Sequence, residues 1–154
     1  MNNKELIDNY PFLNFDDPFW DDDEENAYEI TKLDSMPIGW RKAFGEQLCE
    51  ELKQELIKIG CLYRYRVYQI KEKFGSLRWY GNFENDSIAK ILEKYEEKSK
   101  YTCIRCGAPA TKISRGWISP YCDKCTNSRT KYEEIKPFGK IFKEKVKLDF
   151  LFFL

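Results

Sequence analysis

Apolar residues recur at every fourth position in the segment that follows Gly39. Charged side chains fill most of the positions between them, and this arrangement predicts an amphipathic helix with one face in a core. Pro37 and Gly39 mark the expected start of the helix, and Gly60 marks its end. The apolar stripe consists of Trp40, Phe44, Leu48, Leu52, Leu56 and, at its end, Ile59.

Residues 62–80 show a period of two instead. Aromatic and β-branched residues alternate there with polar ones, and a turn is expected near Phe74 and Gly75. A second apolar run follows this turn and ends at Gly81. The pattern predicts a β-hairpin.

A second amphipathic helix is expected after the hairpin, beginning at a cap formed by Asp86 or Ser87. Its inward positions are Ile88, Ile91, Leu92 and Tyr95. The sequence therefore predicts an α+β fold with a helix–β-hairpin–helix core.

Two C-x-x-C pairs, separated by fifteen residues, lie beyond this core. A gap of two residues lets both sulfurs of a pair reach one metal ion at about 2.3 Å. The pattern predicts a structural Zn²⁺ ion in a zinc ribbon or treble-clef element, while an iron–sulfur cluster on the same ligands remains an open alternative. The predicted ligands are Cys103, Cys106, Cys122 and Cys125.

The residues around these pairs predict local secondary structure. Residues 110–114 and 117–119 are expected to form a hairpin that turns at Arg115 and Gly116, and residues 126–135 a short helix. Cys49 and Cys61 lie outside the paired spacing and are expected to act as small buried hydrophobic residues.

Charge divides the 154-residue chain in two although the formal net charge is zero. Residues 1–97 carry 13 basic and 21 acidic side chains, whereas residues 98–154 carry 13 basic and 5 acidic ones. The start of the chain lacks the pattern of a secretory signal, and no apolar run approaches the roughly 20 residues that span a bilayer. These features predict a cytoplasmic protein without a membrane span, in which cysteines are reduced and bind metal.

The residue types present argue against catalysis. The chain has no histidine, which removes the commonest general base and the usual ligand of catalytic zinc. Four thiolates also leave no open position on a tetrahedral metal ion. The glycines are isolated, so no phosphate-binding or dinucleotide-binding loop is present. We therefore expect a binding protein and not an enzyme.

The chain is expected to divide into four segments. An acidic, aromatic N-terminal arm covers residues 1–35, and the α+β core covers residues 36–100. The zinc-binding module follows at residues 101–135, and a segment that is first basic and then apolar covers residues 136–154.

Three stretches resemble a family of small proteins from bacteriophages and other bacterial mobile elements. They are MPIGWRKAFG at residues 36–45, QIKEKFGSLRWY at residues 69–80, and the cysteine block at residues 102–125. The family has no established activity that can be carried over. The resemblance implies a setting inside a bacterial host cell, where proteins of this kind often bind host or defence machinery.

Two functions are compatible with these observations. In the first, the arm binds a bacterial protein and inhibits a defence or nucleic-acid enzyme, because its acidic and aromatic residues could imitate a nucleic-acid backbone. The residues expected in this role are Asp16, Asp17, Phe19, Trp20, Asp21, Asp22 and Asp23.

In the second, the zinc module binds nucleic acid through basic side chains and a stacking indole. The residues expected in this role are Arg105, Lys112, Arg115, Trp117, Lys124, Arg129 and Lys131. Against this function, the basic residues could merely balance the thiolates and the acidic arm, and the isoelectric point near 6.4 is far from that of a typical nucleic-acid binder.

Overall fold

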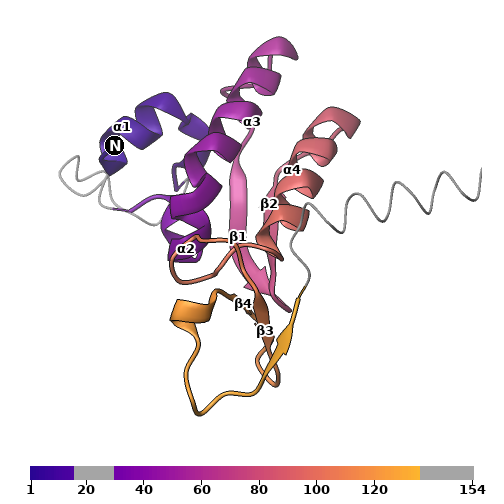
Figure 1. Ribbon diagram of the computed structural model, residues 1–154. Coiled ribbons are helices and arrows are strands. Elements are labelled where there is room, and N and C mark those ends of the chain that lie inside the picture. Colours follow the sequence, from indigo (N-terminus) through magenta and orange to yellow (C-terminus); the bar gives the residue numbers. More distant parts are fainter. Residues whose placement is uncertain (16–29, 136–154) are drawn as a thin grey trace, which may run out of the picture.

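The apolar stripe at residues 40–56 forms one face of a continuous helical segment in the computed structural model, which describes residues 1–15 and 30–135 (Figure 1). The segment consists of α2 (Ile38–Trp40), a π-helical turn η3 (Arg41–Gly45) and α3 (Glu46–Lys58). All five stripe residues from Trp40 to Leu56 are fully buried. Ile59 was expected to close the stripe, but it follows the end of α3 and is 37% exposed.

The π turn helps to keep the stripe on one face. Four residues of an α-helix rotate about 40° beyond a full turn, so a strict four-residue repeat drifts around the helix. The wider π turn holds more residues per turn and reverses part of this drift between Trp40 and Phe44.

The hairpin consists of β1 (Val67–Lys73) and β2 (Ser76–Gly81), which pair in antiparallel fashion. Ile70, Leu77 and Trp79 face the core and are buried. The first strand begins later than its alternation predicts, because the chain first forms a turn in which the amide of Tyr65 donates to the carbonyl of Cys61 at 3.0 Å. Tyr65 is buried by this turn, and its hydroxyl accepts a hydrogen bond from Trp79 Nε1 at 3.2 Å.

Helix α4 (Asp86–Ser99) completes this part of the fold by packing on β2 and α3. Its N-cap is Asn85, one residue earlier than predicted, since the side chain of Asn85 accepts the Ile88 amide at 2.9 Å. At the other end, the buried hydroxyl of Ser99 accepts the Leu77 amide at 2.8 Å and so ties α4 to β2.

The beginning of the chain is part of the core. Helix α1 (Asn3–Asn9) and the 3-10 turns η1 (Pro11–Leu13) and η2 (Lys32–Ser35) cover the long helix and the hairpin. Phe12, Leu13 and Leu33 are completely buried there. Tyr10 and Phe12 of the arm therefore lie on the chain's own core, whereas Phe15 is 37% exposed.

A second, three-stranded antiparallel sheet follows α4, with the order β4 (Pro120–Tyr121), β3 (Lys112–Ser114), β5 (Tyr132–Glu134). Residues 132–134 form a strand on β3, so the expected helix in this segment is wrong. The partner strand of β3 begins at Pro120 and not at Trp117, because Ser114 closes the intervening loop through hydrogen bonds to Ser119.

The prediction of a fold that combines helices with small antiparallel sheets is confirmed at this level. Within the described ranges, no helix is long and apolar enough to cross a lipid bilayer.

Candidate metal centre

The first cysteine pair lies in a tight loop that begins four residues after the end of α4. The amide of Cys103 donates to Ala108 O at 2.7 Å, and the amide of Gly107 donates to Cys103 O at 3.0 Å. Gly107 has a φ of 81°, a left-handed conformation that favours glycine. This loop turns both side chains of the pair to the same side.

The second pair follows strand β4. Cys122 lies directly after the strand, and Cys125 ends the 3-10 turn η4 (Asp123–Cys125). The amide of Cys125 donates to Cys122 O at 3.1 Å, which closes this turn. The amide of Ile104 donates to Pro120 O at 3.0 Å, and this bond places the two loops side by side.

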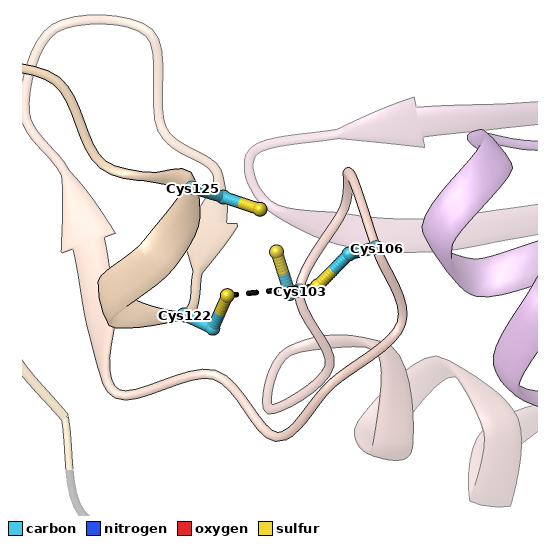
Figure 2. Close-up of side chains that lie close together, drawn as sticks. All are labelled: Cys103, Cys106, Cys122 and Cys125. Atoms are coloured by element: carbon cyan, nitrogen blue, oxygen red, sulfur yellow. Dashed lines mark hydrogen bonds between the residues drawn. The ribbon is translucent and has the colours of Figure 1, made fainter.

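The four sulfurs point toward a common centre, two from each loop (Figure 2). All four Sγ atoms lie within 4.8 Å of one another, and those of Cys106 and Cys122 are 3.5 Å apart. A tetrahedral ion bound at 2.3 Å would place its sulfur ligands about 3.8 Å apart. The donor set therefore fits one metal ion, and the four cysteines could hold it.

Local hydrogen bonds change how readily these thiols ionise. Burial disfavours the Cys103 thiolate, but the amides of Cys122, Cys106 and Arg105 donate to its sulfur and lower its pKa to about 7. The hydrogen bond with the Cys122 sulfur, aided by burial, raises the pKa of Cys125 to about 12. The Cys103 thiol therefore ionises more readily than the Cys125 thiol, which gives up its proton when a cation binds.

The loop that carries Cys103 and Cys106 packs directly on the start of the long helix. The amide of Gly39 donates to Ile104 O at 2.9 Å, and Trp40 Nε1 donates to Thr102 O at 2.9 Å from a buried position. A Cβ atom on Gly39 would lie 2.2 Å from Cys103 O, and one on Gly107 would lie 2.6 Å from Gly39 O. Only glycine fits at either position.

Sequence reasoning missed this contact. Gly39 was interpreted as a helix-start signal, and nothing in the local sequence of Gly39 or Gly107 shows that the two residues touch.

The predicted nucleic-acid-binding residues fall into two groups. Lys112 forms ion pairs with Asp123 at 3.4 Å and Glu134 at 3.9 Å, and Arg115 pairs with Glu133. These carboxylates compensate both charges. The remaining basic residues are exposed and form no ion pair within residues 1–15 and 30–135: Arg105, Lys124, Arg129 and Lys131.

The other two cysteines are not members of the metal-binding group. Cys49 is completely buried in the core, and this burial raises the pKa of its thiol. Cys61 is half-buried and packs against the same core. The residues predicted for the protein-binding arm, Asp16 to Asp23, lie outside the described residues.

No family model matches this chain, and neither a curated protein nor a solved structure matches it.

Proposed function

We propose that this chain is a small zinc protein of phage type that acts by binding a partner and not by catalysis. One structural zinc ion would be held by Cys103, Cys106, Cys122 and Cys125, in a module of the zinc-ribbon or treble-clef kind. The observation that carries the proposal is the convergence of four sulfurs within 4.8 Å, from two loops of matching C-x-x-C spacing.

A structural role suits the chemistry of this donor set. Four thiolates complete the tetrahedral coordination of zinc, so neither water nor substrate has a position on the metal. The loop that carries Cys103 and Cys106 also packs against Gly39 and Trp40 of the long helix. A bound ion would therefore link the second sheet, through this loop, to the rest of the fold.

Two classes of partner follow from the sequence. A bacterial protein bound through the acidic arm is the first, and a defence or nucleic-acid enzyme would be its target. Replacement of Asp21, Asp22 and Asp23 by asparagine should then abolish capture of that protein in a pull-down from host lysate. Capture unchanged by the triple substitution would contradict a role for the arm.

Nucleic acid is the second class, and one observation favours it. Trp117 is 79% exposed, and the basic side chains of Arg105, Lys124, Arg129 and Lys131 are not compensated by described carboxylates. An exposed indole and uncompensated positive charge on the same module suit a ligand that has flat rings and phosphates. Four of the six basic residues predicted to bind nucleic acid therefore have no carboxylate partner among the described residues, and their charge is available to a ligand.

The zinc assignment is tested by measuring the metal content of the Cys122→Ser variant, with Cys61→Ser as the control. We expect one zinc ion per chain in the wild type and in Cys61→Ser, and loss of the ion in Cys122→Ser together with unfolding of residues 101–135. A wild-type melting curve and full zinc content in Cys122→Ser would overturn the site. If the purified wild-type protein contains iron and absorbs visible light, the site holds an iron–sulfur cluster and the zinc assignment is wrong.

A further inference from the structure

Two loop tips that are distant in sequence meet where the hairpin adjoins the second sheet. The turn between β1 and β2 contains Phe74 and Gly75, and the loop between β3 and β4 contains Trp117 and Ile118. A Cβ atom on Gly75 would lie 3.2 Å from Ile118 Cγ2 and 3.4 Å from Ile118 O, so the two loops are in contact. Figure 1 shows the closed end of the hairpin beside the β3–β4 region.

Each of these loops exposes an aromatic ring. Phe74 is 73% exposed and Trp117 is 79% exposed, and each is the chain neighbour of a residue in the contact between the loops. Tyr80, on the outer face of β2, is also exposed. Tyr80 pairs with Gln69 near the open end of the hairpin, so it lies further along the outer face than the two loop tips. Large aromatic side chains normally bury their area, so the exposed rings at the tips and along this face mark a binding surface.

The conformation of Phe74 is unfavourable for its residue type. Phe74 has a φ of 52° and Gly75 a φ of 81°, the two positive values that a two-residue type I′ hairpin turn requires. Asparagine or glycine usually occupies the first position, and a bulky side chain there is an outlier. The turn is stabilised by Glu72, whose Oε1 atom accepts the Gly75 amide at 2.7 Å. The fold thus retains an unfavourable residue whose ring it leaves in solvent.

Lysines lie beside two of these rings. Because side chains alternate along a strand, Lys71, Lys73 and Tyr80 share the outer face of the hairpin, opposite the buried Ile70 and Trp79. Lys71 Nζ lies 5.6 Å from the centre of the Tyr80 ring, and Lys73 Nζ lies 5.7 Å from that of Phe74.

Neither of these lysines has an ion-pair partner among the described residues. The third basic residue on this face, Arg78, is paired with Glu96 of α4. Phe74 and Tyr80 therefore each lie next to one uncompensated positive charge.

We propose that this surface, formed by Phe74, Tyr80 and Trp117 with Lys71 and Lys73, binds single-stranded nucleic acid. We call it the aromatic tip. A single strand offers unpaired bases that can stack on exposed rings, and phosphates that pair with lysine. Duplex bases are already stacked on one another and present only their edges. The inference rests on the second partner class of the proposed function and gives it a site at the hairpin turn and the adjoining loop.

The test measures binding of the zinc-loaded full chain to a labelled single strand about 12 nucleotides long by fluorescence anisotropy, with the duplex as comparison. Trp117→Ala should weaken binding about tenfold, because one base loses its stacking partner. Phe74→Asn should weaken it similarly without lowering the melting temperature, since asparagine accepts the turn conformation. If the Phe74 ring had only a structural role, Phe74→Asn would instead lower the melting temperature and leave binding unchanged.

Controls of equal exposure separate the surface from general effects. Ile38 is 71% exposed in α2, outside the hairpin and the β3–β4 loop, so Ile38→Ala should bind like the wild type. Lys71→Ala combined with Lys73→Ala should reduce the slope of log affinity against log salt by about 1.4, or 0.7 per phosphate contact. The matched pair Lys58→Ala and Lys90→Ala, on α3 and α4, should leave the slope unchanged.

Three results would overturn the proposal: no binding of the single strand at low salt, binding unaffected by both Trp117→Ala and Phe74→Asn, or attachment of the aromatic tip to anionic lipid vesicles alone. The zinc content and melting curve of the same samples are recorded in parallel. Full zinc content without strand binding would remove the aromatic tip as a nucleic-acid site while leaving the structural zinc assignment intact. Absence of zinc from the purified wild-type protein would instead refute the structural zinc assignment.

Discussion

Two backbone oxygen atoms limit which residues fit where the loop of Cys103 and Cys106 contacts the long helix. The carbonyl oxygen of Cys103 occupies the space that a side chain on Gly39 would need, and Gly39 O does the same for Gly107. Both obstacles are backbone atoms, which cannot rotate away as a flexible side chain can. The close approach also lets the Gly39 amide and the Trp40 indole reach carbonyl groups of residues 102–104.

Gly39→Ala should therefore destabilise the protein by about 2 kcal/mol or more, as expected of a steric conflict in a packed interior. Its matched control is Gly45→Ala in the same helical segment, where the nearest atom to the new Cβ is Arg41 Cγ at 3.2 Å, part of a flexible side chain. Alanine favours helix over glycine by about 1 kcal/mol, so Gly45→Ala should be neutral or stabilising. Urea unfolding followed by tryptophan fluorescence measures both. Equal stability of the two variants would contradict the tight contact.

At the scale of elements, α3 and α4 are joined by one carboxylate. Glu51 accepts a hydrogen bond from the Tyr95 hydroxyl at 2.8 Å and pairs with Lys94. Burial opposes ionisation of Glu51, but these two partners outweigh it, so the pKa of Glu51 lies below its ordinary value. The same contact, together with burial, raises the pKa of Tyr95.

This depressed pKa gives a pH dependence with a definite sign. The Glu51 contribution is fully present above the pKa of the unfolded chain, near 4.3, and is lost as the pH falls through the lower folded value. Glu51→Gln should cost about 1 kcal/mol at pH 7, and the difference from the wild type should shrink below about pH 4.

Urea unfolding at several pH values measures this difference. The control is Glu55→Gln one turn further along α3, where Glu55 forms no ion pair with any described residue. A gap between Glu51→Gln and the wild type that stays constant down to pH 3 would contradict the linkage.

The elements also show how far the sequence pattern could be followed. The long helix and the helix at residues 86–99 were predictable, because a period near four residues reports one buried face. The strand at residues 132–134 was not, since its polar sequence has no period and its partners, the backbone of β3 and the side chains of Lys112 and Arg115, are distant in the sequence. The start of β1 was misplaced because the buried Tyr65 continues the alternation outside the strand.

On the scale of the whole molecule, the apolar core is complete without the cysteine-bearing module at residues 101–135. Every fully packed member of the core cluster belongs to residues 6–95, and from the cysteine loops only Ile104 packs against it. The module is joined to this core by the Gly39 contact, the Trp40–Thr102 hydrogen bond and the contact between the two loop tips. Such an attachment predicts separate stability for the two parts.

Removal of the metal by a chelator should therefore unfold residues 101–135 and leave the core folded. In hydrogen exchange, the amides of Gly39 and Ile104 should lose protection, because their acceptors are Ile104 O and Pro120 O. The Leu77 amide, bound to Ser99 Oγ inside the core, should stay protected and serves as the internal control. Simultaneous loss of protection at all three amides would show that core and module unfold as one unit.

The sequence by itself determined the long helix, the hairpin, the second helix and the set of four cysteines. Each depends on a local signal, either the period of apolar residues or the two-residue gap of a metal-binding pair. The tertiary structure alone decided the rest: Phe12 and Leu13 in the core, Gly39 against Cys103, and the exposed Phe74 near Trp117. These features join residues far apart along the chain, and which of them meet depends on how the finished elements pack.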